Sequence, residues 1–294
     1  MQGKIDCAGL TDPGRVRPEN EDQFLIASLS KSMQVHQTSL GLDEQTRLFG
    51  ASQGRLLLVA DGVGGHAAGR RASALAVDSL TAYILNTMQW FFRLRQDSED
   101  QFLDDLKAAL GYCQERVNAE GERFTERRGM GTTLTMAYLC WPRMYVVHAG
   151  DSRCYLLRGG RLKQITHDHT IAQQLVEVGA IKDPDGSPWS HVLWNVVGGG
   201  SGELTPEVDR ADLTLGDSVL LCSDGLSKHV GDADIARLLG ASHPSTETCR
   251  HLVDAANSAG GTDNITVVVA HFRDAKSQQT ARQAAEQVPA TASA

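Results

Sequence analysis

The sequence predicts a layered α/β fold in which largely antiparallel sheets are covered by helices. Predicted strands come first, two long helices follow, and then come further strands, more helices and a final strand. Strands and helices that alternate regularly are typical of a parallel sheet, so this order favours antiparallel sheets with helices stacked outside them. No linker-like stretch interrupts residues 1–273, and we expect them to form one domain.

Composition narrows the class of protein. Hydrophobic residues make up 41% of the 294 residues and charged residues 22%, which is ordinary for a globular domain with a sizeable core. The net charge of −8 argues against non-specific nucleic-acid binding and against an anionic membrane surface. The sequence contains neither an apolar run of membrane-spanning length nor an N-terminal signal core, so we expect a cytoplasmic protein. The six scattered cysteines indicate small buried side chains and not a disulfide framework or zinc site.

The first half of the chain is expected to combine N-terminal strands with two amphipathic helices. Residues 4–10 and 22–29 have the composition of strands, and the polar stretch 30–54 is expected to be a hairpin with a long loop. Apolar residues recur at i, i+3 and i+4 spacing in 68–90 and 99–119, which predicts two helices.

The second half is expected to return to strands before its last helices. Strands are predicted at 132–140, 144–149, 153–157, 162–165, 219–222 and 265–272. Helices are predicted after Asp168 as N-cap, ending at Gly179, and then at 232–239 and 247–258. The Pro- and Gly-rich stretch 182–202 is expected to be a loop, and 274–294, which lacks apolar periodicity, a disordered tail.

Acidic residues stand at the ends of five predicted strands. Three apolar runs end beside an Asp and a Gly, at Asp61-Gly62, Gly150-Asp151 and Asp224-Gly225. Two further strands begin directly after Asp263-Asn264 and Asn20-Glu21-Asp22. A single Asp-Gly pair is usually just a turn. Five acidic strand ends in one domain indicate carboxylates that converge at one edge of the sheets.

Converging carboxylates repel one another unless protons or cations neutralise them. With no His or Cys ligand pattern in competition, their oxygens suit Mg²⁺ or Mn²⁺. Two such ions roughly 3.5–4 Å apart are the arrangement of many phosphoester-hydrolysing centres. Arg17, just before the first acidic cluster, is a candidate for holding the phosphate, although a lone loop arginine can equally be solvated.

Six short motifs occur together and in order. They are Arg17-Pro18-Glu19-Asn20-Glu21-Asp22, Asp61-Gly62-Val63-Gly64-Gly65-His66, Gly131-Thr132-Thr133, Gly150-Asp151-Ser152-Arg153, Ser223-Asp224-Gly225 and Asp263-Asn264. Over roughly residues 4–272 the chain resembles the bacterial form of the metal-dependent protein phosphatases, the type 2C Ser/Thr phosphatases. The resemblance implies an α-β-β-α sandwich of two mainly antiparallel sheets with a dimetal site at one end, occupying residues 1–273.

The resemblance also implies the ligands of two Mn²⁺ or Mg²⁺ ions. Asp61 would bridge both ions, and the carbonyl of Gly62 would ligate one of them. Asp224 and Asp263 would complete the coordination of one ion, and Asp22 would help to hold the centre.

Further roles follow from the same resemblance. Glu21 would orient a water at the metal centre, Arg17 would grip the substrate phosphate, and Asp151 would contribute to a weaker third metal site. The implied activity is hydrolysis of phosphoserine and phosphothreonine in a protein substrate, opposing a cognate Ser/Thr kinase. We expect a monomer that binds neither nucleic acid nor membrane. A non-catalytic phosphoprotein-binding module on the same fold is the alternative, and the presence of Arg17 with the full set of aspartates favours the enzyme.

The chain departs from the family pattern at the third metal site. Bacterial relatives usually carry an aspartate four residues after that of Ser-Asp-Gly, where this chain has Lys228. Its ammonium either pairs with Asp151 in place of an ion or points to solvent. The third ion is therefore in doubt, while the ligands of the first two are complete.

Two other positions also differ from relatives. Val63 stands where eukaryotic members have a histidine, and nearby His66 is expected to brace the glycine turn. The flap, about residues 163–202, ends in a segment where Asn195 replaces the usual arginine and Trp194 is bulky. The altered flap puts substrate recognition in doubt and leaves the metal ligands unaffected.

Overall fold

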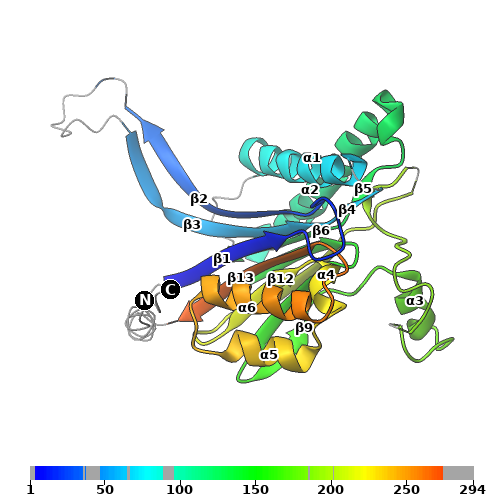
Figure 1. Ribbon diagram of the computed structural model, residues 1–294. Helices are drawn as coiled ribbons and strands as arrows, with labels where there is room; N and C mark the ends of the chain where they lie inside the picture. Colours follow the sequence, from blue (N-terminus) through cyan, green and yellow to red (C-terminus); the bar gives the residue numbers. More distant parts are fainter. Residues whose placement is uncertain are drawn as a thin grey trace, which may run out of the picture.

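The computed structural model describes residues 4–35, 37, 47–64, 67–88, 96–184, 186–200 and 202–273. Within this part of the chain two five-stranded antiparallel sheets lie face to face, and helices cover both outer faces (Figure 1). The layered sandwich predicted from the sequence is confirmed.

Each large sheet combines strands from distant parts of the chain. The first sheet has the order β1 (Lys4–Asp12), β13 (Ile265–Arg273), β12 (Ser218–Cys222), β8 (Arg153–Arg158), β9 (Arg161–Gln164). The second has the order β11 (Glu207–Asp212), β7 (Arg143–Ala149), β6 (Leu134–Cys140), β3 (Arg47–Ala60), β2 (Gln23–Gln34). Three short strands, β10 (Val197–Gly198), β5 (Gly131–Thr132) and β4 (Gly62–Val63), form a small third sheet.

Helices close the sandwich on both sides. The long helices α1 (Ala67–Asn86) and α2 (Gln96–Arg123) pack on the second sheet, and α2 leads into the short 3₁₀ helix η1 (Thr125–Arg127). The helices α4 (Asp224–Ser227), α5 (Asp232–Gly240) and α6 (Ser245–Ser258) cover the first sheet. Helix α3 (Ile171–Glu177) stands away from the sandwich, at the lower right of Figure 1.

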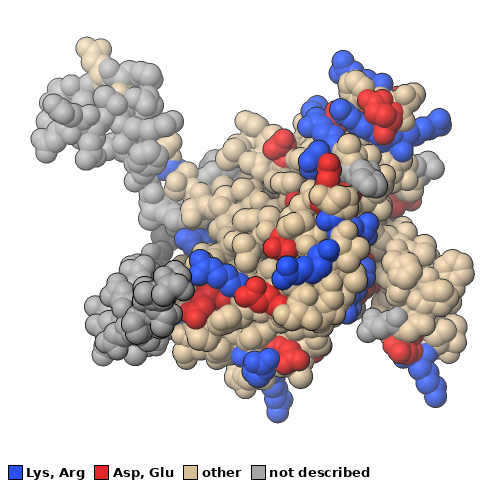
Figure 2. All heavy atoms as spheres, viewed as in Figure 1, with Lys and Arg blue, Asp and Glu red and all other residues tan. Residues whose placement is uncertain are grey.

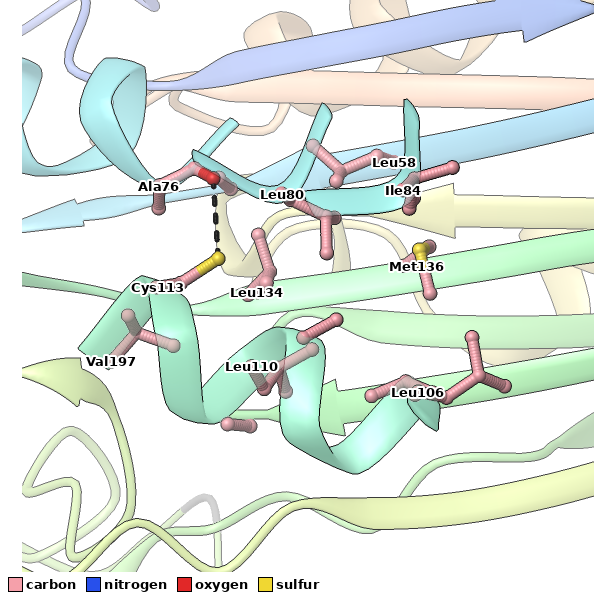
Figure 3. Packing of buried hydrophobic residues seen from close by; sticks show 14 of the residues in the cluster. Leu58, Ala76, Leu80, Ile84, Leu106, Leu110, Cys113, Leu134, Met136 and Val197 are labelled. Atoms are coloured by element: carbon pink, nitrogen blue, oxygen red, sulfur yellow. Dashed lines mark hydrogen bonds between the residues drawn. The ribbon is translucent and has the colours of Figure 1, made fainter. Parts of the chain in front are cut away.

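The continuous apolar runs of the central strands follow from burial on both faces. In β3, Leu57 and Val59 point between the sheets, whereas Leu58 points toward α1 and α2. Figure 3 shows this outer layer, in which Leu58 lies near Leu80 and Ile84 of α1. The same division occurs in β12. A strand buried on both faces needs no polar alternation, which explains why these strands were readily predicted.

Several local expectations need correction. Thr170, not Asp168, caps α3, because the Thr170 side chain accepts a hydrogen bond from the amide of Gln173. The polar strand β11 was not predicted. By contrast, the hairpin expected at 30–54 is observed, because β2 and β3 pair antiparallel as far as Gln34 and Arg47. Expectations about His66 and the tail 274–294 fall outside the described residues.

The described surface carries both signs of charge. On the face seen in Figure 2 acidic and basic side chains are interspersed, with Lys and Arg most frequent at the upper right, near the end of α2. Within the described residues, none of the helices combines the length and the apolar character needed to cross a bilayer.

Candidate metal centre

Asp61 lies where the buried strand β3 leaves the second sheet. Its amide donates to the Thr133 hydroxyl (3.0 Å), and its carbonyl accepts from the Thr133 amide and the Thr132 hydroxyl (both 2.8 Å). The backbone beside it is tightly packed, because a Cβ at Gly62 would lie 2.3 Å from the carbonyl oxygen of Gly69 in α1. Glycine is therefore required after Asp61 by the close approach of α1.

Asp22 is buried between the two sheets' ends and is only 2% exposed. Its Oδ2 accepts hydrogen bonds from Ser223 and Thr266, both at 2.7 Å. Its Oδ1 is also buried, and within the described residues it has no hydrogen-bond donor. Burial raises the pKa of Asp22 to about 7, although these two hydroxyls favour its ionised form. Because Oδ2 accepts hydrogen bonds and Oδ1 has no donor among the described residues, Oδ1 is available as a metal ligand.

Asp224 shows the same division between its two oxygens. Its Oδ2 is ion-paired with Lys228, four residues later, whereas its Oδ1 is buried without a donor among the described residues. The sequence had suggested either a Lys228 pair with Asp151 or a solvated lysine. The ion pair instead involves Asp224, because one turn of helix separates the two residues and brings their side chains together.

Asp263 and Arg17 meet at the exposed edge of the cluster. The guanidinium contacts both carboxylate oxygens at 2.9 Å, and 54% of the Arg17 side chain remains exposed. The hydrogen bond to Asp263 raises the pKa of Arg17, so the side chain stays cationic. The next residue, Asn264, fixes the loop that carries Arg17 through hydrogen bonds to the carbonyls of Pro13 and Glu19.

Asp151 follows β7 and is buried near Asp224 and Lys228. Burial and the negative charge of Asp224 raise the pKa of Asp151 to about 8, and the positive charge of Lys228 opposes this rise. Lys228, which stands where relatives have an aspartate for the third ion, thus interacts with both Asp224 and Asp151. Its ammonium already supplies a positive charge there.

The five aspartates form one electrostatic group. Burial, and after it the charges of Asp22, Asp224, Asp151 and Asp263, raise the pKa of Asp61 well above its usual range. The convergence predicted from the sequence is therefore observed for every aspartate proposed. Two buried carboxylate oxygens without donors, on Asp22 and Asp224, fit hard cations that prefer oxygen ligands. This chain's own residues can hold Mg²⁺ or Mn²⁺ at this place.

Glu21 lies beside the aspartates and against the start of α1. A Cβ at Gly69 would lie 2.0 Å from Glu21 Oε2, so the glycine makes room for this carboxylate. The Glu21 backbone is held on both sides, because its amide donates to Asn264 (2.8 Å) and its carbonyl accepts from Ser73 (2.6 Å). Its position suits a supporting role at the edge of the centre.

Sequence reasoning missed the neutral side chains that support the aspartates. Ser223, Thr133 and Asn264 stood inside the motifs, but only their acidic neighbours were assigned roles. Nothing in the sequence around Thr266 distinguished it from an ordinary strand residue. Its hydroxyl reaches Asp22 only because β13 lies beside the Asp22 loop in space.

The base of the flap is built around His169. Its amide donates to the carbonyl of Gly150 (2.8 Å), and its Nδ1 accepts from the Gly150 amide (3.1 Å) and the Asn195 carboxamide (2.9 Å). Asn195 is buried and also makes two hydrogen bonds with the backbone of Thr205. The ring of Trp194, 40% exposed, lies 5.0 Å from that of His169. Asn195 is thus an anchor of the flap, and Trp194 is the part available to a partner.

Comparison with known proteins agrees with this arrangement. The family model described as "Protein phosphatase 2C" matches residues 37–260. The chain belongs to this family. A curated relative, the serine/threonine protein phosphatase PstP of Mycobacterium tuberculosis, is 38% identical over 229 residues, which are 77% of this chain. The alignment covers 42% of the relative's length, so this chain spans less than half of that protein.

Solved structures extend the similarity beyond the family match. The catalytic domain of PstP in complex with two manganese ions has a TM-score of 0.70 at 33% identity, covering 92% of this chain and 99% of that one. PppA, described as a key regulatory component of the type VI secretion system in Pseudomonas aeruginosa, has a TM-score of 0.68 at 30% identity and covers 91% and 97%. The bacterial phosphatase resemblance drawn from the six motifs is confirmed.

Proposed function

We propose that this protein is a Mn²⁺- or Mg²⁺-dependent protein phosphatase that hydrolyses phosphoserine and phosphothreonine. The observation that carries the proposal is the convergence of five aspartates in which buried oxygens of Asp22 and Asp224 lack donors among the described residues. Without cations such a group is electrostatically unfavourable, and a structural role does not explain it. The two manganese ions in the related PstP domain support the same conclusion.

Each residue of the centre has a defined part in this proposal. Asp61, Asp22, Asp224 and Asp263, with the Gly62 carbonyl, hold two ions. When bound, such ions stabilise charge on phosphoryl oxygens and lower the pKa of water, so that hydroxide is available at neutral pH. Glu21, fixed between Asn264 and α1, orients water at the edge of the centre.

Arg17 binds the phosphate of the substrate. The planar guanidinium presents several N–H donors that match phosphate oxygens. Its half-exposed position beside Asp263 places these donors at the entrance to the carboxylate cluster. Trp194 and the rest of the flap contact the protein part of the substrate.

Lys228 replaces the third ion. Its ammonium is paired with Asp224 and interacts with Asp151, so the residue expected to contribute to that third site already has a cation beside it. A full positive charge at this position repels a divalent ion and so disfavours its binding there. The enzyme then needs two ions only.

The proposed activity also implies a biological setting. The substrate is a phosphorylated protein, and a bacterial Ser/Thr kinase supplies the phosphate that the enzyme removes. We propose a cytoplasmic monomer. The relative from the type VI secretion system makes a substrate in secretion machinery one candidate, beside the other processes that such kinases control.

Hydrolysis of p-nitrophenyl phosphate in the presence of Mn²⁺ tests the activity. We expect wild type to be active and Asp61→Asn to lose at least about a hundredfold in rate, the order of loss when one group that stabilises transition-state charge is removed. Asp254→Asn, on the exposed face of α6, is the matched control and should behave as wild type. If wild type is as inert as Asp61→Asn but still binds a phosphopeptide, the alternative of a non-catalytic binding module replaces this proposal.

A further inference from the structure

A second group of metal-ligating side chains lies at the N-terminal end of α6. His243 comes two residues before the helix, and Glu247 and His251 follow on it at intervals of four residues. Residues four apart share one face of a helix. The ligand atoms of all three side chains lie within 4.8 Å of one another.

Glu247 stands between the two imidazoles. Its Oε2 lies 3.2 Å from His243 Nδ1, and its Oε1 lies 4.0 Å from His251 Nε2. The two rings are nearly perpendicular, with centroids 4.9 Å apart. All three side chains are about 40% exposed, so an ion from solvent can reach them.

The backbone that carries this group is fixed. Arg273, at the end of β13, donates to the carbonyl of His243 at 2.7 Å. Ser245, the first residue of α6, donates through its amide and its hydroxyl to Asp6 of β1, at 2.9 and 2.6 Å. The start of α6 is therefore held against the edge strand β1 and the end of its neighbour β13. Ligands mounted on such a support lose little freedom when they bind an ion.

The group is separate from the carboxylate centre. Helix α6 has 14 residues, and a helix of that size is about 21 Å long. The loop that leads to Asp263 leaves its other end, while His243 precedes its first turn. In Figure 1, α6 runs along the outer face of the first sheet.

We propose that His243, Glu247 and His251 form a binding site for a late first-row divalent ion, of which Zn²⁺ is the probe of choice. Two imidazole nitrogens and a carboxylate suit Zn²⁺, whereas Mg²⁺ and Mn²⁺ prefer the all-oxygen ligands of the main centre. Three protein ligands leave one tetrahedral position for water. The ion joins the segment before α6 to the helix itself and stabilises the folded protein.

A second triad, formed by His148, His169 and Glu207, also has its ligand atoms within 4.8 Å of one another. It is the weaker candidate for a metal site. His148 uses both ring nitrogens in contacts with Thr135 and the carbonyl of His167, and His169 Nδ1 accepts two hydrogen bonds. These nitrogens serve the flap base and are not directed to solvent. The α6 group is therefore the better candidate for a metal site.

Calorimetric titration with Zn²⁺ tests the site by comparing wild type with site variants, because the carboxylate centre is also expected to bind ions. We expect the double variant His243→Ala/His251→Ala to bind one Zn²⁺ fewer than wild type, or to bind it at least about tenfold more weakly, the loss caused by removing even an outer partner of a metal ligand. Glu247→Gln should show the same weakening. His191→Ala, which removes an exposed histidine of the flap, is the matched control.

Thermal unfolding provides the second measurement. Zn²⁺ should raise the unfolding midpoint of wild type more than that of the double variant, since an ion that binds only the folded state stabilises it. Mn²⁺-dependent hydrolysis of p-nitrophenyl phosphate should be the same in both, which shows that the variant is folded. Equal Zn²⁺ stoichiometry and affinity in wild type and both site variants overturns the proposal, as does an equal loss in His191→Ala. Because the outcomes that overturn the proposal are measurements of Zn²⁺ binding, and the unfolding transition itself shows that each variant is folded, an inactive wild type leaves the test intact.

Discussion

Asp224 shows how one residue can serve two neighbouring positions of a charged centre. Its Oδ1 is buried and lacks a donor among the described residues, whereas its Oδ2 is ion-paired with Lys228. A lysine ammonium differs from a bound ion because it is covalently attached to the chain and cannot dissociate from the site. The charge beside Asp151 is therefore permanent. In the proposed reaction, the need for a third ion therefore depends on a single side chain.

Replacing Lys228 by Asp should add a metal requirement. We expect wild-type activity to reach its plateau in a single phase as Mn²⁺ rises, because only the two-ion centre has to fill. Lys228→Asp should need a further, higher concentration range, since three carboxylates then surround the third position. The measurement is the rate of p-nitrophenyl phosphate hydrolysis against Mn²⁺ concentration. Lys228→Met separates loss of the ammonium from gain of a ligand, and superimposable curves for wild type and Lys228→Asp would contradict the two-ion proposal.

At the scale of elements, the sequence predicted what depends on local signals. Leu56–Ala60 and Val219–Cys222 are strands because both of their faces are buried, and Asp61 and Asp224 follow them where the chain must turn. Strand β11 was missed because it is a polar edge strand without a run of apolar residues.

Contacts with a residue in another segment of the chain could not be predicted from the sequence. Aspartate is a common N-cap residue. The Asp168 carboxylate instead accepts hydrogen bonds from the guanidinium of Arg153 in β8, the shortest at 2.6 Å. The Asn195 substitution suggested a change in substrate contact, but its three hydrogen bonds lie inside the flap base. Both contacts are created by the packing of segments far apart in the chain, which no local pattern encodes.

The flap and the Asp151 loop are joined through His169. One side of the ring accepts from the Gly150 amide, next to Asp151, and the same nitrogen accepts from Asn195. Since Nδ1 accepts both hydrogen bonds, the proton of the neutral ring is on Nε2, which faces Glu207 at 3.4 Å. The flap end and the backbone beside the metal centre therefore share one hydrogen-bonding atom.

Asn195→Ala should loosen this connection. The change removes two hydrogen bonds to the backbone of Thr205 and one to His169, and a typical intramolecular hydrogen bond contributes about 0.5–1.5 kcal/mol to stability. We expect lower thermal stability and a higher KM for a phosphorylated protein, with a smaller change for p-nitrophenyl phosphate, which is too small to contact the flap. Steady-state kinetics with both substrates, alongside Asp254→Asn on the exposed face of α6 as the control, make the comparison. Equal effects on the two substrates would show that Asn195 does not act through the flap.

In the whole molecule, the candidate centre is assembled from both sheets. Asp22 precedes β2 and Asp61 follows β3 in the second sheet, whereas Asp224 follows β12 and Asp263 precedes β13 in the first. Folding therefore brings like charges together at the end of the sandwich, and the free energy of folding must include their desolvation and repulsion. Ions that bind only the assembled centre compensate for this cost. Metal binding, protonation of the aspartates and global stability are thereby linked.

The stability of the metal-free protein should show this linkage in its pH dependence. Folding raises the pKa of Asp22 to about 7, whereas an unfolded aspartate titrates near about 3.9. Between these values the folded state binds the extra proton, so this group destabilises the protein progressively as pH rises from about 4 to 7. Burial lowers the pKa of His148 and of His271 to about 4, which acts in the opposite direction up to about pH 6.5.

The substitution Asp22→Asn removes this carboxylate together with its repulsion of Asp61, whereas the two histidines are common to both proteins. In EDTA, we expect the unfolding midpoint of Asp22→Asn to gain on wild type as pH increases from 5 to 8. Each kcal/mol of the difference should appear as roughly 2–4 °C for a chain of this size. Mn²⁺ should reverse the order at pH 8, since it stabilises the ionised wild-type centre and finds one ligand fewer in the variant. A difference between the two midpoints that is independent of pH, and unaffected by Mn²⁺, would mean that Asp22 carries no buried charge into the centre.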